Sequence, residues 1–283
     1  MERISFKTAG AYALSVATVD DAGAAVTATA PVTIVVTDGA GTEVYSGSAT
    51  PALGLCTAAV PVAELAELDT YTCEWTDDAD SPLQFASTVE LCGAHLFEVA
   101  ALRAFDPAFA SLAKYPEARM RQARLSAEVR FERAAGVAFV HRGRRVAVPG
   151  DGTFRFRLPD KAVYDVVSAS LDEVALTAEE LAALVIHEWG ALDRPEGIVW
   201  TAGKMVAVHY LHGLAYPPEP VVTACKLLAR ETLMPSSLSA RATVEATEVG
   251  FFRLSIAGPG HSTGIPEVDE VAREFGRNGP NIG

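Results

Sequence analysis

The sequence predicts an α+β protein, in which an N-terminal all-β sandwich precedes a helical domain with an inserted small β-sheet. The first 92 residues are rich in Ala, Thr and Val and carry short segments of period-two alternation. Two helical patterns follow, over residues 116–136 and 217–234, and strand-like segments lie between them. We expect three parts: a sandwich over 1–95, the helical domain over 96–257 and a glycine-hinged segment over 258–283.

The N-terminal strands are predicted from residue type and from turn signals. Residues 31–47 read PVTIVVTDGAGTEVYSG, in which β-branched residues run up to Asp38-Gly39, a strong hairpin turn, and a second strand follows. Residues 69–76 alternate apolar and polar side chains, and residues 83–91 form a further candidate strand. Short strands separated by Gly, Asp and Pro indicate a small sandwich, which carries no chemistry of its own.

The first long helix is predicted over residues 116–136, because Pro116 suits the first helical position and Gly136 suits the stop. One apolar stripe consists of Met120, Ala123, Ala127, Phe131 and Ala134. Leu125 and Val129 fall nearly opposite this stripe. A helix with two apolar stripes must bury both. We therefore expect Leu125 and Val129 to lie in a large core or against a neighbouring subunit.

The later segments predict a small sheet and a second helix. Strand candidates lie at 152–159, 164–176, 197–200 and 204–213, with a turn at Asp172-Glu173. In the first of them, Phe154, Phe156 and Leu158 alternate onto one face. Thr177 and Glu180 form a capping-box pattern before a helical turn. The helix over 217–234 is apolar almost all round, so we expect it to be central and buried.

The charge of the chain limits its partners. The net charge is −13 and the isoelectric point is about 4.9, so broad binding to DNA phosphates is disfavoured. An acidic surface does suit a path along which DNA slides without sticking. The four cysteines have no metal-ligand spacing and indicate buried residues in a reducing compartment. No signal peptide or apolar run of membrane-spanning length is seen, so we expect a soluble protein made in the cytoplasm.

No motif for catalysis is found. The glycine-rich stretch over 258–264, GPGHSTG, lacks the lysine of a P-loop and has a proline where backbone amides would face a phosphate, so a hinge is favoured. His187-Glu188 has no second histidine at metalloprotease spacing. His209 and His212 lie three apart in a predicted strand, which favours packing over metal binding. We therefore expect no enzyme activity, no metal and no cofactor.

Three arginines follow the first helix in the stretch HRGRRVAVPG. Arg142, Arg144 and Arg145 form a local basic cluster. One interpretation is a solvated loop. The other is an electrostatic contact with an acidic partner or with passing DNA.

From Leu102 onward, the order of elements resembles the head-to-tail adaptor proteins, also called head completion or connector proteins, of tailed phages that infect actinobacteria. The stretches that carry the resemblance are LRAFDPAFASLAKYPEARMRQARLSAEVRFERAAGVAFVHR, SLDEVALTAEELAAL, GIVW, KMVAVHYLHGLAYPPEPVVTACKLLARETL and STGIPEVDEVAREFGRN. They span roughly residues 100–280. The N-terminal strands look like the immunoglobulin-like or fibronectin-like domains common on phage structural proteins.

The resemblance implies a ring, typically twelve-fold, that docks beneath the portal protein in the neck of the virion. Such a ring assembles in the host cytoplasm, extends the channel for double-stranded DNA without sequence preference, and presents a platform for stopper or tail proteins. It uses no membrane. Other neck components, namely a stopper or a tail terminator, remain alternatives. So do a carbohydrate- or surface-binding module and a hydrolase carrying an appended sandwich.

The C-terminal segment fits this interpretation. Glycines at 258, 260 and 264 would let the segment swing, and Pro266 starts a short helix. The residues that recur on one face of that helix are Ile265, Val268, Val271 and Phe275. A helix of about ten residues is marginal alone in water. We expect it to become ordered only against the portal or an adjacent adaptor subunit.

Overall fold

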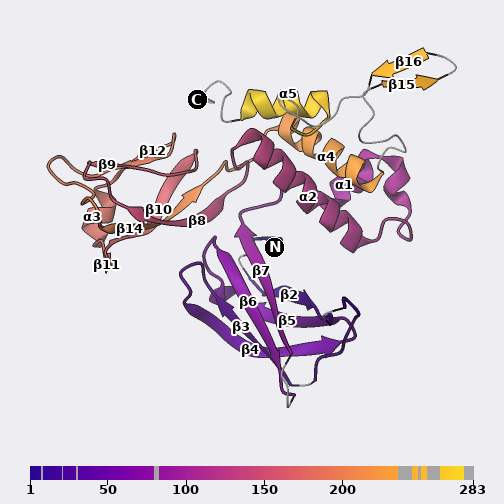
Figure 1. Cartoon of the computed structure of the whole chain (residues 1–283), viewed down its shortest axis with the longest axis horizontal. Coiled ribbons are helices and arrows are strands. Elements are labelled where there is room, and N and C mark those ends of the chain that lie inside the picture. The colour runs from indigo at the N-terminus through magenta and orange to yellow at the C-terminus, as the bar shows by residue number, and fades with distance from the viewer. Residues whose placement is uncertain are drawn as a thin grey trace. The chain divides into compact units, whose positions relative to one another are not determined.

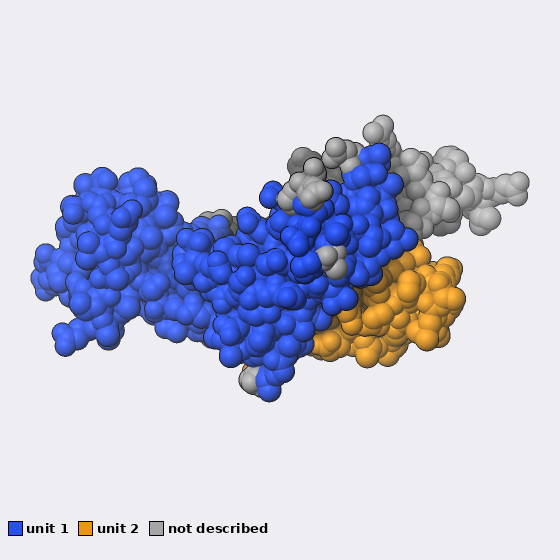
Figure 2. All heavy atoms as spheres, turned by 90° about the horizontal axis from the view of Figure 1, so that it is seen from below, with its two compact units in different colours: residues 1–94, 141–159, 163–212 blue, residues 95–140, 160–162, 213–283 orange. Residues whose placement is uncertain are grey.

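The computed structural model describes residues 1–7, 9–20, 22–29, 31–79, 83–234, 244–247, 250–253 and 262–276. These residues form a large curled antiparallel sheet, two smaller sheets and five α-helices, so the expected α+β class is confirmed (Figure 1). The chain divides into two compact units, coloured separately in Figure 2: residues 1–94, 141–159 and 163–212, and residues 95–140, 160–162 and 213–283. Strands from the middle of the chain, which the sequence groups with the helices, therefore belong with the N-terminal strands.

The N-terminal part of the first unit is a sheet that curls back on itself. Its elements are β1 (Glu2–Ser5), β2 (Ala11–Ala17), β3 (Val32–Thr37), β4 (Glu43–Ala52), β5 (Leu55–Pro61), η1 (Val62–Glu64), β6 (Thr70–Asp77) and β7 (Gln84–Cys92). They pair in the order β2-β5-β4-β3-β6-β7, and β1 adds to β7 in parallel. Residues 43–49 of β4 pair with β3 and its last three residues pair with β5, so β4 carries the chain from one layer to the other. The predicted hairpin and strands are thus present as β3–β4, β6 and β7.

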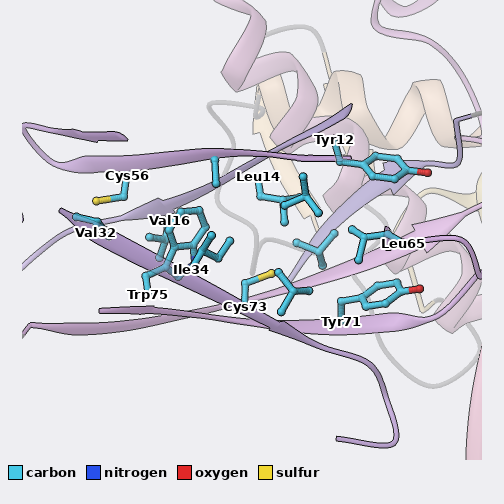
Figure 3. Packing of buried hydrophobic residues seen from close by; sticks show 14 of the residues in the cluster. Tyr12, Leu14, Val16, Val32, Ile34, Cys56, Leu65, Tyr71, Cys73 and Trp75 are labelled. Carbon is cyan, nitrogen blue, oxygen red and sulfur yellow. The ribbon is translucent and has the colours of Figure 1, made fainter. Parts of the chain in front are cut away.

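The core of this curled sheet is built by alternate residues of facing strands. Figure 3 shows side chains of β2 and β5 pointing toward those of β3 and β6. The fully buried members include Tyr12, Ile34, Val36, Cys56, Val60, Cys73 and Trp75. The indole N–H of Trp75 donates to the Ser87 hydroxyl at 3.1 Å, which satisfies its only polar group. All four cysteines are buried, and burial raises the pKa of Cys73 to about 11.

The rest of the large sheet and a separate three-stranded sheet complete the first unit. The ladder β11-β10-β14-β8 consists of β8 (Arg142–Pro149), β10 (Val163–Leu171), β11 (Val174–Ala175) and β14 (Met205–His212). The sheet β12-β13-β9 consists of β9 (Arg155–Arg157), β12 (Val185–His187) and β13 (Ala191–Asp193). A single residue pair, Cys92 with Arg142, connects the ladder to β7. The short helix α3 (Ala178–Ala182) begins with the predicted capping box of Thr177 and Glu180.

Two sequence expectations in this region are wrong. The arginine-rich stretch is not a loop, because Arg142–Pro149 pairs with β14 along its length. Phe154 does not share the buried face of Phe156 and is 49% exposed. The cause is a turn before β9, in which the Asp151 carboxylate accepts bonds from the backbone N–H and the hydroxyl of Thr153.

The second unit is helical. Its elements are α1 (Val99–Phe105), η2 (Pro107–Ala110), α2 (Glu117–Ala135), α4 (Glu219–Leu233) and α5 (Pro266–Phe275), together with the paired strands β15 (Val244–Thr247) and β16 (Gly250–Arg253). Helix α2 ends at Gly136, whose φ of 69° lies in the left-handed region that glycine favours. None of the described helices is long and apolar enough to cross a membrane.

Helices α2 and α4 pack against each other. The first stripe predicted for α2 is buried at Met120, Ala123, Ala127 and Phe131, whereas Ala134 is half-buried. Helix α4 buries one side, including Val221 and Leu228, but its other side reaches solvent, so the expectation of burial all round is wrong. The Arg230 guanidinium of α4 lies 2.7 Å from the Asp106 carboxylate before η2 and lowers the pKa of that carboxyl.

Gly143 gives a direct test of the first unit. A Cβ placed on Gly143 would lie 1.6 Å from the Leu68 carbonyl oxygen, a backbone atom. We expect Gly143→Ala to lower the free energy of unfolding by about 3 kcal/mol, the upper part of the usual cost of overpacking. Urea denaturation measures this. The control Gly197→Ala has open space around it and only a positive φ, so it should cost about 1 kcal/mol; equal losses in both variants would contradict the close approach.

Candidate functional site

The outward side of α2 carries a row of four residues spaced four apart: Arg121, Leu125, Val129 and Arg133. Such spacing places them along one side of the helix. The two arginines are exposed, and Leu125 and Val129 between them are half-buried. Arg121 also donates to the Glu117 carboxylate at 3.3 Å. We call this set the α2 row. The second predicted stripe is therefore a surface feature in which a small apolar centre is flanked by cations.

The inward side of α2 holds a second row that the sequence analysis missed. Arg124, Glu128 and Glu132 recur every four residues and are all buried. The Glu128 side chain has no exposed surface and accepts a hydrogen bond from the Leu96 backbone N–H at 2.9 Å. Arg124 Nη2 lies 2.8 Å from His95 Nε2. This row could have been identified in the sequence, because charged residues recur at three positions spaced four apart, directly beside the apolar stripe of the same helix.

Glu132 extends this network to the end of the helix. Its carboxylate accepts a hydrogen bond from the Phe139 backbone N–H at 3.4 Å. The segments before and after α2 are thus both bonded to carboxylates of the helix. A buried charge without such partners is costly. These bonds therefore fix the rotation of α2 about its axis and keep the α2 row outward.

The C-terminal helix α5 lies on α2 and α4 of the same unit (Figure 1). Val268 has no exposed surface, while Ile265, Val271 and Phe275 are half-buried. The expectation that this face is ordered only by another protein therefore needs correction, because much of it is already covered by the chain itself. Deleting residues 258–283 would uncover apolar surface and is no clean test of partner binding.

Polar bonds before α5 hold the helix in place. The Asp269 carboxylate accepts hydrogen bonds from the Thr263 hydroxyl at 2.8 Å and from the Thr263 backbone N–H at 2.9 Å. Arg130 of α2 donates to the Thr263 carbonyl. Gly264 has a φ of 75°, so glycine is needed there. Residues 258 and 260, the other two glycines of the predicted hinge, lie outside the described residues.

The basic cluster of β8 is largely used within its own unit. Arg145 lies 2.7, 3.2 and 3.7 Å from carboxylates of Asp69, Asp38 and Glu67. Arg142 lies 3.3 Å from the Glu90 carboxylate. Arg144 is exposed. Ion pairs with the N-terminal strands therefore account for two of the three arginines, and charge reversal at Arg142 or Arg145 would disturb folding before it disturbed any partner.

A second polar cluster lies on the three-stranded sheet and was also missed. The register puts Arg155 opposite Asp193 on neighbouring strands. The guanidinium bonds both carboxylate oxygens, at 2.7 and 2.6 Å, and His187 Nε2 lies 2.9 Å from one of them. The Trp189 ring covers Arg155 at 5.2 Å. Hydrogen bonds from Arg155, which has the larger effect, and from His187 lower the pKa of Asp193 to about 2.

Val268 tests the attachment of α5. We expect Val268→Asp to release α5, because an unpaired carboxylate cannot replace a fully buried isopropyl group. Amide hydrogen exchange over residues 265–275 should then approach that of an unfolded peptide, while α2 and α4 remain protected. The control Glu270→Ala alters an exposed residue of the same helix and should leave exchange slow. Unchanged protection in the Val268 variant would contradict this packing.

The Asp193 cluster makes stability depend on pH. A carboxyl with a lowered pKa stabilises the fold above its unfolded pKa of about 3.9, and this contribution is lost as pH falls toward about 2. We therefore expect wild type to exceed Arg155→Gln in stability at pH 6, with the difference shrinking between about pH 4 and 2. Denaturation at several pH values measures it. Arg157→Gln, on the same strand, is the control; a difference constant with pH would contradict the assignment.

The described residues contain no group of three or more His, Cys, Asp or Glu side chains placed to hold a metal ion. No protein-family model matches the sequence, and no curated protein matches it. The candidate site is therefore defined by its geometry alone: the α2 row, the half-buried side of α5 and the exposed Arg144.

Proposed function

We propose that this chain is a structural protein of the phage neck, which forms a ring that joins the portal to the tail and extends the DNA channel. The observation that supports the proposal is the packing of four helices in the second unit. Residues of the resembling stretches 102–142, 204–233 and 262–278 contribute to α1, α2, α4 and α5, which are far apart in sequence and pack together, whereas the stretches 170–184 and 197–200 lie in the first unit. A protein built this way would act by binding other proteins, without a reaction of its own.

The outward α2 row supports self-association. Its apolar centre is only half-buried in one chain, and its flanking arginines would fix the orientation of a neighbour. A ring needs a heterologous contact, in which one surface of a subunit meets a different surface of the next. We take the α2 row as one of these two surfaces and the half-buried side of α5 as a surface for the portal or the adjacent subunit.

The N-terminal strands support an immunoglobulin-like domain within the same proposal. Seven strands between Glu2 and Cys92 form two layers around one core, as such domains do. Among the described residues up to Cys92, the exposed large apolar side chains are Met1, Val19, Leu53, Leu55 and Leu83, and none is aromatic. An aromatic platform for carbohydrate is thus not offered by this part of the surface.

Leu125 tests the proposal. Negative-stain microscopy of the purified chain, alone and with its portal protein, should show rings of about twelve subunits for wild type. Leu125→Glu should abolish them, because it puts a charge at the apolar centre of the contact. Thr223→Glu adds the same charge at an exposed site of α4 and should leave the rings intact.

The outcomes separate clearly. Wild-type chains that stay monomeric on the portal would refute the neck function. Rings that persist in Leu125→Glu would remove the α2 row from the contact.

A further inference from the structure

The chain separates its charges along its length. Residues 1–92 contain 13 Asp and Glu but two Lys and Arg, and no Lys or Arg occurs between Lys7 and Arg103. The exposed carboxylates among the described residues of this part are Glu2, Asp20, Glu43, Glu64, Glu67, Glu74 and Asp78. Arg3 is buried and bonded to Glu90. Residues 1–92 therefore contribute −11 (2 − 13) of the net charge of −13, and seven of their carboxylates are exposed in the described residues.

One face of these strands is polar. Val32, Ile34 and Val36 of β3 are buried, so Thr33, Val35 and Thr37 point to the opposite face. The register sets Glu74 of β6 opposite Val35, and Glu43 of β4 opposite Thr37. We call the outward side of β4, β3, β6 and β7 the Glu43/Glu74 face. Its own four strands carry the exposed carboxylates Glu43 and Glu74 among Ser and Thr and no Lys or Arg, while Glu90 of β7 is buried and bonded by Arg3 and Arg142 from other strands.

The α2 row has the complementary pattern. Its ends are the exposed cations Arg121 and Arg133, and its centre is apolar, as is Val35 on the sheet face. Twelve residues of helix place the two arginines about 18 Å apart. Glu43 lies on β4 and Glu74 on β6, so the two carboxylates are two strand spacings, about 10 Å, apart across the sheet. The long arginine side chains would therefore have to lean inward for a helix crossing these strands to bring both cations to the carboxylates, with its apolar centre near Val35.

We propose that the Glu43/Glu74 face of one copy docks on the α2 row of a second copy. The inference rests on the proposed ring and names the surface that the α2 row meets. A second copy is favoured over DNA because the face offered is acidic and repels phosphate, while it attracts the cations of the row. Two unlike, complementary surfaces on each chain make a heterologous contact, the kind that closes into rings. The N-terminal strands thus act in assembly.

Charge exchange tests this contact. The helix variant is Arg121→Glu with Arg133→Glu, and the sheet variant is Glu43→Lys with Glu74→Lys. Ring formation, alone and on the portal protein, is measured by negative-stain microscopy and analytical ultracentrifugation. Each variant alone should weaken assembly at least about tenfold, because like charges then meet. The control Arg157→Glu reverses an exposed cation elsewhere and should assemble as wild type does.

Mixing the two variants is the decisive step. In an equal mixture, every contact can pair either two altered surfaces or two unaltered ones, so rings should return. Circular dichroism must show that both variants are folded. A mixture that stays dispersed, while one chain carrying all four changes assembles, would show a contact within a chain and overturn the inference.

Two other results are equally clear. Full assembly of the sheet variant would refute the Glu43/Glu74 face and leave the ring proposal standing. If only the helix variant fails, the α2 row meets another surface or DNA phosphate, and the inference is again overturned. Absence of wild-type rings would overturn both proposals.

Discussion

The second unit depends on the buried carboxylate of Glu128. This side chain has no exposed surface, and it receives the Leu96 N–H at the point where the chain enters the helical unit. One turn away on either side, Arg124 and Glu132 contact the same entering segment and the segment that leaves the helix. A helix held only by apolar contacts can rotate or slide at little cost. A helix with three buried charges, each bonded to particular partners, cannot rotate or slide without leaving at least one buried charge without its partner.

The surface of the unit follows from this constraint. Fixing the inner side of α2 against the loops also fixes the opposite side, where Leu125 and Val129 lie between two arginines. The same rotation brings Arg130 to the Thr263 carbonyl, and so positions the start of α5. The packing of α5 in turn covers Val268 and leaves the outer part of its apolar face half-buried. The two surfaces that we assign to partners are thus consequences of one buried network.

Local patterns predicted the elements well because their causes are local. Alternation identified β6, Gly136 marked the end of α2 correctly, and Pro116 marked its start to within one residue, since it precedes the first helical residue, Glu117. The wrong predictions concern residues whose surroundings are determined by contacts with residues far away in the sequence. Arg145 was predicted to lie on a loop because its ion-pair partner Asp69 lies 76 residues away in the sequence. Helix α5 was predicted to need another protein because α2, on which it packs, lies more than 130 residues earlier. Of the candidate site, it was predictable that Leu125 and Val129 lie opposite the first apolar stripe, but not whether the core of the chain would cover them. The buried charges that hold them there were not, since a charged residue on a helix usually faces water.

The charge distribution adds a constraint that composition alone conceals. A net charge of −13 spread evenly over 283 residues would cause modest self-repulsion, whereas residues 1–92 alone carry −11, which Arg142 and Arg145 offset only in part. Copies brought together in a ring would repel each other if these surfaces met. The repulsion is removed when each acidic face meets a cationic helix instead, and the same pairing excludes the reverse arrangement of subunits. Segregated charge therefore acts against the wrong contacts as much as it favours the right one. In the proposed ring, the exposed acidic residues outside the Glu43/Glu74 face would remain available to repel DNA in the channel.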